Sequence, residues 1–409
     1  MRKNSLNLFE AKKTVFALFF LALASAAVFF LRPRSPIDFD YISIGCRIFK
    51  TDGTLVFGDD RSYLCDHKSD GHLLQMGAGL YNSRGGLVYS QKGVVHHDYK
   101  FSPDGKFTLT IEAQDMSLDG KLHKVDCVVR RTLTGDVDAR WCLGDHLAEL
   151  ARDGYFFEPW PRVSYPGNPE IKARSELSHA NSIFEIPENP LGHVDPAFAK
   201  GNYLLNLYGE SNFMIIIDHD MKKYLKVFSM AQFPFPPTVG QPRFLAVAEN
   251  KFDIRYQSMT VHDSKLLSDG NILSYGTQIL GGGGDYVSNI IRQCIDKKSY
   301  VCGPGTHGGP RGKTIVFKWN PLHREKDLKV IWVADESKAI PGPIHGSVYE
   351  LKNGNYLILD VGRPISKIFV VNSRGEKLWA FPSLFHKTAL FSARPLYDLG
   401  FLKARGLLD

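Results

Sequence analysis

The sequence lacks several features that mark common classes of protein. Its six cysteines include no Cys-x-x-Cys spacing, which argues against a zinc site or a thiol redox motif. Helical periodicity is almost absent outside residues 142–153, which argues against a helical or α/β domain. The net charge beyond the N-terminal region is also small. Residues 1–34 hold six Lys or Arg and one Glu, or +5 of the total +7, which leaves +2 for residues 35–409. A basic nucleic-acid groove is therefore not expected.

Two glycine-rich segments fall short of a phosphate-binding motif. The segment THGGPRGKT (306–314) ends like a phosphate loop, but His307 stands where the first glycine belongs, and no strand-to-helix context surrounds it. The segment GGGGDYV (281–287) lacks the Gly-x-Gly-x-x-Gly frame and is predicted to form a loop at a channel rim. Neither a cofactor nor a metal ion is expected.

What the sequence does contain is a repeated unit in which a histidine opens a strand, and a turn leads into a second strand. The four copies are VVHHDYKFSPDGKFTLTIEA (94–113), LSHANSIFEIPENP (177–190) continued by GNYLLNLYG (201–209), TVHDSKLLSDGNILSYG (260–276) and PIHGSVYELKNGNYLILDVG (343–362). Their histidines are 82, 83 and 83 residues apart: His97, His179, His262 and His345. A glycine follows in each turn, at Gly105, Gly201, Gly270 and Gly354.

A second repeated unit gives the number of blades. Six hairpins share an apolar strand, a polar or glycine turn and another apolar strand: FKTDGTLVF (49–57), LYNSRGGLVY (80–89), RTLTGDVDARW (131–141), IDHDMKKYLKVF (217–228), KWNPLHREKDLKVIW (318–332) and VVNSRGEKLWAF (370–381). Short strands at regular spacing favour a radial all-β array over a sandwich. The sequence therefore predicts a six-bladed β-propeller, with these hairpins on the outside and the histidine strands innermost. Innermost strands line the central channel, so the four histidines should converge at one end of it.

The N-terminal region predicts a membrane anchor. Residues 14–31 (TVFALFFLALASAAVFFL) are eighteen uncharged residues, the length of a membrane helix. Four basic residues precede this segment and two follow it, which places the N-terminus in the cytoplasm. The expected domains are a cytoplasmic tail at 1–13, the anchor at 14–31, a linker at 32–39 and the propeller at 40–409. The protein is then a single-pass inner-membrane protein whose propeller faces the periplasm or the cell exterior.

A cleaved signal peptide is the competing interpretation of the same segment. Ala24-Ser25-Ala26 is an acceptable cleavage site. The apolar residues that continue from Val28 to Leu31 favour an uncleaved anchor.

The cysteines fall in close sequential pairs, which is typical of local disulfides behind an export signal. The pairs are Cys46 with Cys65, Cys127 with Cys142, and Cys294 with Cys302. Cys127 and Cys142 flank one outer hairpin, where antiparallel neighbours lie within disulfide reach. Buried free thiols remain the alternative for any single pair.

Taken together, the histidine segments resemble the successive inner-strand motifs of the bacterial arylsulfotransferase family. The matching motifs are His-His-Asp before a turn, Ser-His-Ala-Asn-Ser, Val-His-Asp with LLSDGNILSYG, and GSVYELKNGNYLILDVG. The resemblance covers most of the chain beyond the linker. It implies an exported six-bladed propeller that moves a sulfuryl group from an aryl sulfate donor to a phenolic acceptor, through a sulfated histidine and without a nucleotide donor.

The resemblance also implies roles for individual residues. His262 matches the nucleophile of the family, while His97 and His179 match the histidines of its first His-Asp motif and its His-x-Asn-Ser motif. An imidazole is a competent nucleophile at neutral pH and a good leaving group when protonated. The candidate substrate-binding residues are His96, Asp98, Asn181, Asp263, His345, Arg363 and Arg255.

One departure from the family pattern keeps a second hypothesis open. Gly209 stands where the family has an arginine after its second histidine motif. A sulfuryl donor site that lacks this cation should bind its substrate more weakly. Arg363 and Arg255 are the candidates to replace it from other strands. The alternative is a non-catalytic propeller scaffold that binds an anionic or aromatic ligand in the cell envelope.

Overall fold

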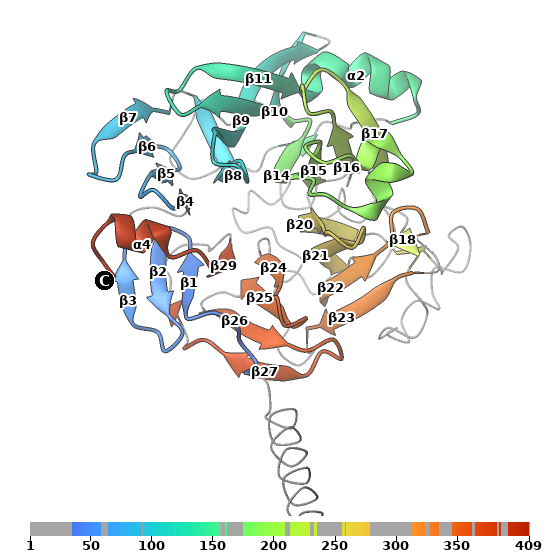
Figure 1. Ribbon diagram of the computed structural model, residues 1–409. Coiled ribbons are helices and arrows are strands. Elements are labelled where there is room, and N and C mark those ends of the chain that lie inside the picture. The colour runs from blue at the N-terminus through green and yellow to red at the C-terminus, as the bar shows by residue number, and fades with distance from the viewer. Residues whose placement is uncertain are drawn as a thin grey trace, which may run out of the picture.

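In the computed structural model of the protein, six sheets are arranged radially, and the four main strands of each sheet are antiparallel. The structure describes residues 35–58, 64–91, 93–118, 120–155, 157, 160–161, 175–208, 213–229, 233–234, 256–257, 259–278, 313–323, 327–334, 346–361, 365–382, 384–385 and 392–408. Figure 1 shows the sheets surrounding a common centre, each with one strand nearest the axis. The predicted six-bladed β-propeller is therefore confirmed.

In blades 2 and 3 the strands lie in chain order from the axis outward, and in blade 1 the C-terminal strand β29 is innermost. Blade 1 contains β29 (Ala393–Leu396), β1 (Tyr41–Ile44), β2 (Arg47–Lys50) and β3 (Leu55–Phe57). Blade 2 contains β4 (Cys65–His67), β5 (Leu73–Gln75), β6 (Gly79–Tyr81) and β7 (Leu87–Ser90). Blade 3 contains β8 (Val94–Phe101), β9 (Phe107–Leu118), β10 (Lys121–Thr132) and β11 (Val137–Cys142).

The other three blades follow the same order. Blade 4 contains β14 (His179–Glu185), β15 (Tyr203–Tyr208), β16 (Phe213–Ile217) and β17 (Tyr224–Ser229). Blade 5 contains β20 (Met259–Leu266), β21 (Ile272–Gln278), β22 (Lys313–Trp319) and β23 (Lys329–Val333). Blade 6 contains β24 (Gly346–Glu350), β25 (Tyr356–Val361), β26 (Ile365–Val371) and β27 (Lys377–Ala380). In every blade the two outer strands form the hairpin that the sequence predicted.

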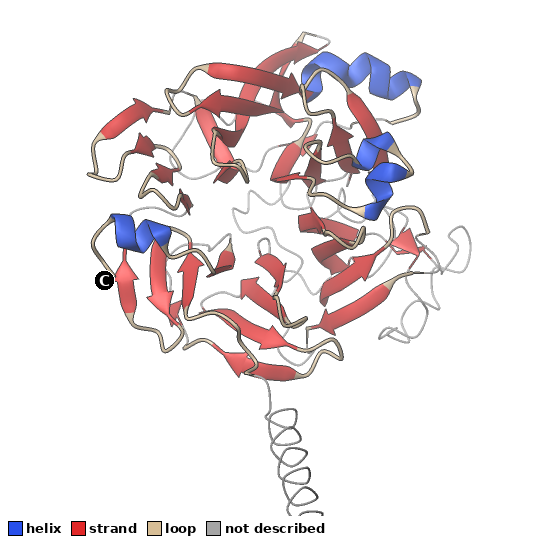
Figure 2. Cartoon of the chain, viewed as in Figure 1, coloured by secondary structure: helices blue, strands red, loops and turns tan. Residues whose placement is uncertain are grey.

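A few short elements lie outside this pattern. The additional strands are β12 (Trp160–Pro161), β13 (Ser175–Glu176), β18 (Phe233–Pro234), β19 (Tyr256–Gln257) and β28 (Leu384–Phe385). The helices are α2 (Leu143–Arg152), α4 (Gly400–Ala404) and the 3-10 turns η2 (Pro190–His193) and η3 (Pro196–Phe198). Figure 2 shows α2 at the edge of the ring and α4 between blades 1 and 2. The helix α2 occupies the one segment where helical periodicity was found in the sequence.

The hydrophobic core is divided among the contacts between neighbouring blades. Blades 4 and 5, for example, pack Phe228 against Trp319, whose rings are 5.7 Å apart. Blades 1 and 2 are joined by Phe57 and Phe401 of α4, with ring centroids 5.0 Å apart. Blade 4 is packed between two neighbouring blades, so both faces of its strand β16 are covered. The sequence of β16 (FMIII) is therefore continuously apolar rather than alternating.

The repeated glycines of the sequence occupy the turns that follow the inner strands. Gly105, Gly201, Gly270 and Gly354 have φ angles of 68°, 90°, 84° and 81°. This left-handed region is open to glycine and costs other residues free energy. The glycine spacing therefore reflects the backbone of the tight turns.

Two disulfides are present among the described residues. The Cys46–Cys65 bond joins the turn after β1 to β4, and so links blade 1 to blade 2. The Cys127–Cys142 bond joins β10 to β11 within blade 3. Both predicted pairs are confirmed, whereas Cys294 and Cys302 lie outside the described residues.

The predicted membrane anchor also lies outside the described part of the chain. No helix within the described ranges has the length and apolar character needed to cross a bilayer. The assignment of residues 14–31 stays a prediction.

Candidate functional site

Bulges in three inner strands determine which side chains point toward the axis. The pairing register shifts between Val95 and Tyr99 in β8, between Ala180 and Ser182 in β14, and between Val261 and Asp263 in β20. A bulge leaves a residue out of the ladder and changes the direction of its side chain. The residues left out of the ladder include His97, Asn181 and His262.

This register corrects one detail of the repeat alignment. The sequence spacing equates His179 with His97 and His262, but the bulged position of β14 is Asn181. His179 instead pairs with Tyr208 at the start of β14. The repeat is therefore offset by two residues in blade 4, and the nearly constant spacing of the histidines does not reveal this offset.

Two hydrogen bonds between blades define the histidine site. The Nε2 atoms of His97 and His179 are 2.5 Å apart, and their rings are 4.4 Å apart. Nδ2 of Asn181 lies 3.0 Å from Nδ1 of His262. A hydrogen bond between two imidazoles needs a proton on one of the facing nitrogens. One of the two facing nitrogens therefore donates and the other accepts.

His97 also has an unusual backbone conformation. Its φ angle is 59°, in the left-handed region that histidine seldom occupies. Such a conformation costs about 1–2 kcal/mol and persists only where the surrounding structure imposes it. This feature makes His97 a strong candidate for a functional residue.

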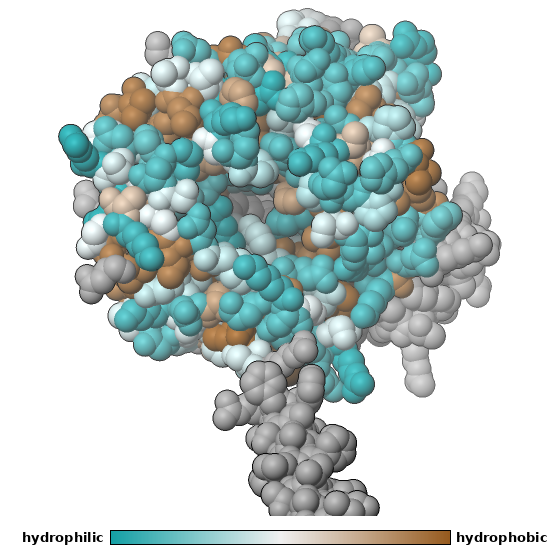
Figure 3. Space-filling view, in the orientation of Figure 1, coloured by the Kyte–Doolittle hydropathy of each residue, from teal (hydrophilic) through white to brown (hydrophobic). Residues whose placement is uncertain are grey.

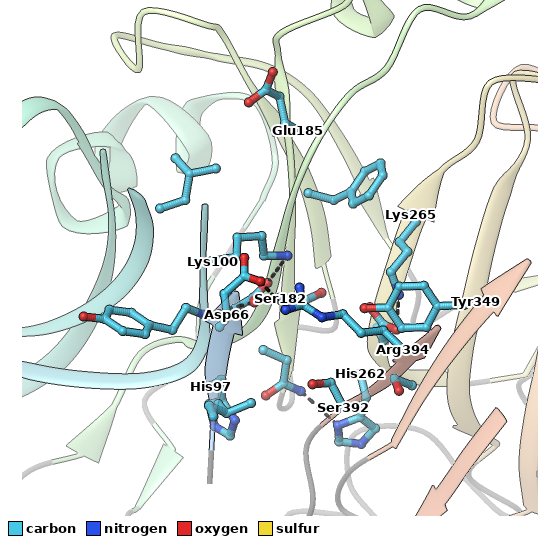
Figure 4. Close-up of a pocket in the computed structure, with 18 of the residues that line it drawn as sticks. Asp66, His97, Lys100, Ser182, Glu185, His262, Lys265, Tyr349, Ser392 and Arg394 are labelled. Atoms are coloured by element: carbon cyan, nitrogen blue, oxygen red, sulfur yellow. Dashed lines mark hydrogen bonds and ion pairs between the residues drawn. The ribbon is translucent and has the colours of Figure 1, made fainter. Parts of the chain in front are cut away.

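The histidine site opens onto an axial cavity of about 250 Å³. All six inner strands contribute to its wall, among them Asp66 of β4, His97 of β8, Asn181 of β14, His262 of β20, Tyr349 of β24 and Arg394 of β29. Figure 4 shows His97 and His262 at one end, Glu185 at the other, and Lys100 and Arg394 between them. In the space-filling view, mostly hydrophilic residues surround the hollow at the centre of the ring (Figure 3).

Arg394 is the cation that the sequence analysis missed. It lies on the innermost strand of blade 1, and its Nη2 pairs with the carboxylate of Asp66 and lies 3.5 Å from Nδ1 of His67. Burial opposes the charged form of Arg394, but Asp66 raises the pKa of the guanidinium above its usual value. Burial alone would raise the pKa of Asp66, yet Arg394 holds it below its usual range. The cavity therefore contains a permanently charged arginine.

The aspartates of the two His-Asp motifs bind the backbone of the next blade. Asp98 accepts a hydrogen bond from the amide of Ile183 at 2.8 Å, and Lys100 donates to the carbonyl of Ile183 at 2.5 Å. Asp263 and Lys265 bind the amide and carbonyl of Val348 in the same way, at 3.1 and 2.9 Å. The Asp-x-Lys unit thus connects neighbouring inner strands, and both aspartates also line the cavity.

His96 turns away from this position and toward a buried carboxylate. Its Nε2 lies 2.6 Å from Oδ1 of Asp126, a residue of β10 that the sequence analysis did not select. An acid between the apolar residues Val125 and Cys127 was the signal that could have identified it. Arg394 had no comparable signal, because its partner Asp66 lies 328 residues earlier.

Several predicted residues lie outside the described part of the chain. They are His345, Arg363, Arg255 and Gly209. Within the described ranges, no group of three or more His, Cys, Asp and Glu side chains is arranged to hold a metal ion.

Fold and site together define the class of the protein as a six-bladed β-propeller with a histidine-lined axial cavity. No protein-family model and no curated protein sequence matches the chain. Among solved structures, the GH93 α-L-arabinofuranosidase of Fusarium graminearum is similar at 13% identity and a TM-score of 0.39, over 86% of this chain and 87% of that one. The β-propeller domain of Myceliophteria thermophila Cps50 (Swd1) is similar at 9% identity and a TM-score of 0.38, over 81% and 74%. Likenesses this distant carry no argument about function.

Proposed function

We propose that the chain transfers a sulfuryl group from an aryl sulfate ester to a phenolic acceptor through a sulfated histidine, without a nucleotide donor. The observation that carries this proposal is the meeting of His97, His262 and Arg394 at one cavity, with His179 hydrogen-bonded to His97. Sulfuryl transfer needs a nucleophile, a proton donor and acceptor, and a cation near the sulfuryl oxygens. These residues supply one group of each kind.

His262 is the proposed nucleophile because Asn181 fixes its ring at Nδ1. The two ends of a side-chain amide exchange by a half-turn, so the same contact also forms with the amide oxygen accepting from Nδ1–H. In that tautomer the lone pair is on Nε2, the nitrogen directed away from Asn181. A nucleophile oriented by a neighbouring hydrogen bond is the usual arrangement in covalent catalysis.

The reaction then proceeds in two balanced steps. First, the Nε2 lone pair of His262 attacks sulfur, an N–S bond forms, and the S–O bond to the aryl group breaks. The electron pair of that bond stays on the phenolate oxygen, which takes a proton from the His97–His179 pair. Second, the acceptor phenol gives a proton to this pair while its oxygen attacks sulfur. The N–S bond breaks and its electrons return to His262.

The size and lining of the cavity suit a small aromatic ester. Its volume of about 250 Å³ is below the range of drug-sized pockets, which begins at roughly 300 Å³. Aromatic side chains line it beside the charged residues, including Tyr349, Phe101 and Phe184. A single-ring aryl group against these side chains would place its sulfate near Arg394 and the histidines.

The test is a turnover assay on the purified full-length protein. With 4-nitrophenyl sulfate as the donor and phenol as the acceptor, release of 4-nitrophenol is followed by absorbance. His262→Ala should reduce turnover by at least about a thousandfold, because removal of a nucleophile leaves only binding and electrostatic effects. His97→Ala or His179→Ala should slow it on the order of a hundredfold, as expected for loss of acid–base catalysis.

Mass spectrometry of the protein quenched during turnover identifies the sulfated residue, which should be His262. The control is His193→Ala, a substitution at an exposed histidine outside the cavity, which should keep full activity. Sulfation of another residue, or full activity of His262→Ala, would contradict the proposal.

The ion pairs made by the basic side chains of the cavity favour a second candidate function, which is ligand binding without catalysis. Arg394, Lys100 and Lys265 are each paired with an aspartate, which reduces the positive potential available to a sulfate. This arrangement favours a non-catalytic scaffold whose cavity binds an aromatic ligand in the cell envelope. In that case calorimetry would detect phenol binding that Tyr349→Ala abolishes, while no aryl sulfate is turned over.

The location of the protein is part of the same proposal. We infer that residues 14–31 hold it in the inner membrane, with the propeller in the periplasm or outside the cell. The two disulfides support an oxidising compartment for the propeller.

A further inference from the structure

Asp126 is a buried carboxylate that contacts two elements of the histidine site. It lies on β10, and only 2% of its surface is exposed. Its Oδ1 is 2.6 Å from Nε2 of His96 and 3.2 Å from Nζ of Lys124. Its Oδ2 accepts from the amide of Ala180 at 2.6 Å and from the hydroxyl of Ser178 at 3.2 Å. Both carboxylate oxygens are thus engaged.

These contacts hold the backbone on either side of His179. Ser178 and Ala180 flank that histidine, and the hydroxyl of Ser178 also accepts from the amide of Asp126 at 3.0 Å. The segment that begins β14 in blade 4 is therefore fixed to β10 of blade 3. Because His179 lies at the centre of this segment, a change at Asp126 would move its imidazole relative to His97.

Asp126 also contributes charge beside three imidazoles. The rings of His96 and His97 are 4.9 Å apart, and those of His96 and His179 are 5.6 Å apart. The charged and titratable groups that face Asp126 are His96 from β8, Lys124 from β10 and His179 from β14. Burial would raise the pKa of Asp126, but Lys124 and then His96 hold it far below its usual range. The carboxylate is therefore ionised at neutral pH.

The pKa of His96 depends on two opposing effects. Burial lowers the pKa of His96, and the carboxylate of Asp126 opposes that effect. Nδ1 of His96 is buried and has no hydrogen-bond partner among the described residues. An imidazole in this position is held by Asp126 on one side and by ring contacts on the other.

We propose that Asp126 is a positioning residue of the histidine site, which fixes His179 and His96 and keeps a proton on the His97–His179 pair. This inference rests on the proposed sulfuryl transfer, in which that proton passes to the departing phenolate. An anion near an imidazole favours its protonated form. A fixed backbone at His179 maintains the short bond to His97, through which the proton is shared.

The substitution Asp126→Asn tests the role of the charge with two donors. Phenyl sulfate has a more basic leaving group than 4-nitrophenyl sulfate, so it depends more on protonation by the histidine pair. We expect Asp126→Asn to slow phenyl sulfate at least about tenfold more than 4-nitrophenyl sulfate. The alkaline limb of the pH–rate profile should move to lower pH by about one unit, because loss of the anion lowers the imidazole pKa.

Asp138→Asn is the matched control. Asp138 lies on β11 of the same blade, where its carboxylate is 2.6 Å from Arg130, and it does not line the cavity. The same change of charge there should leave the ratio of the two donors and the pH profile unaltered. An equal response of both variants would overturn the proposal, since it would show a general effect of charge or stability.

A second variant and a readout independent of turnover separate this inference from the proposed function. Ser178→Ala removes one of the contacts to Asp126 and keeps the charge, so it should slow phenyl sulfate without moving the pH profile. Nitrogen-15 NMR of the histidine rings should show that Asp126→Asn lowers the titration midpoint of His96, whose pKa the carboxylate raises. If imidazole titration is unchanged in Asp126→Asn, the positioning role is wrong whether or not aryl sulfates are turned over. If titration shifts but wild type has no turnover, the role stands and the sulfuryl-transfer proposal fails.

Discussion

His97 is held in a backbone conformation that favours glycine, although its imidazole belongs to the histidine pair. Its φ angle of 59° and the bulge around it direct the ring toward His179. A conformation that costs folding free energy is retained where the side chain has another use. Substitutions of His97 should therefore affect the stability of the fold and the activity of the site in opposite directions.

Replacement of His97 by glycine should measure the cost of its left-handed backbone conformation. We expect His97→Gly to be more stable than His97→Ala by about 1 kcal/mol, because glycine has no penalty in the left-handed region. At His179, whose φ is not positive, glycine should instead be less stable than alanine by roughly 0.5–1 kcal/mol. Urea unfolding of the four variants measures both differences. If the glycine variant is less stable than the alanine variant at both sites, the backbone of His97 is not strained.

His67 provides a pH dependence of stability that can be isolated. Burial, and then the charge of Arg394, lower its pKa from 6.5 to about 3. Between these values the unfolded chain binds a proton that the folded chain does not, so stability falls as the pH drops from about 6.5 to 3. The slope is at most about 1.4 kcal/mol per pH unit.

The variant His67→Phe should reduce this slope, since phenylalanine suits the neighbouring rings of Phe57 and Phe401 and does not titrate. Unfolding free energies of both proteins at several pH values give the comparison. Carboxylates titrate in both proteins, so the difference between the curves reports His67. Identical slopes would show that His67 is protonated in the fold.

At the scale of single residues, the sequence was informative only where a repeat existed. His97 and His262 could be selected because their motifs recur with nearly constant spacing. Arg394 and Asp66 could not, because their pairing depends on a closure of the ring that brings distant segments together. Asn181 was selected as a neighbour of His179, yet its contact with His262 depends on a bulge that no spacing reveals.

Among the elements, the inner strands are joined by the Asp-x-Lys units that follow His97 and His262. In blade 5, Asp263 and Lys265 bind both backbone groups of Val348 in blade 6. The histidine that precedes each aspartate is consequently fixed relative to the next blade. The His-Asp motif therefore combines a cavity residue with a structural one.

Removal of one such carboxylate should be costly. Asp263→Ala leaves the buried amide of Val348 without this acceptor and Lys265 without its carboxylate partner. We expect a loss of about 3 kcal/mol, the usual effect of breaking a buried ion pair. Asp269→Ala, at an exposed turn of the same blade, should cost less than about 1 kcal/mol. Chemical denaturation compares the two, and similar losses would exclude a structural role for the Asp-x-Lys unit.

For the whole molecule, the six outer hairpins were sufficient to predict the number of blades, because each is local in sequence. The closure of the ring was not predictable in the same way. Blade 1 takes β29 from the C-terminal part of the chain and β1 to β3 from the N-terminal part, with Ala393 paired to Ile44. A pairing across almost the whole chain has no local signal, and ARPL is too short to identify an inner strand.

The closure leads to a prediction for the intact ring. Deletion of residues 393–409 removes β29 and α4, including the buried Phe401 and Leu402, and leaves β1 as the inner edge of blade 1. Burial of these two side chains alone contributes about 3–6 kcal/mol, a large part of the 5–15 kcal/mol typical of a folded domain. We expect the shortened chain to lose cooperative thermal unfolding, and a peptide of residues 392–409 added in trans to restore it.

Full-length Arg394→Gln is the control, because it removes the cation and keeps the strand, so its unfolding should stay cooperative. A shortened chain that unfolds at the wild-type temperature would mean that packing between blades holds the propeller closed without the pairing of β29 and β1.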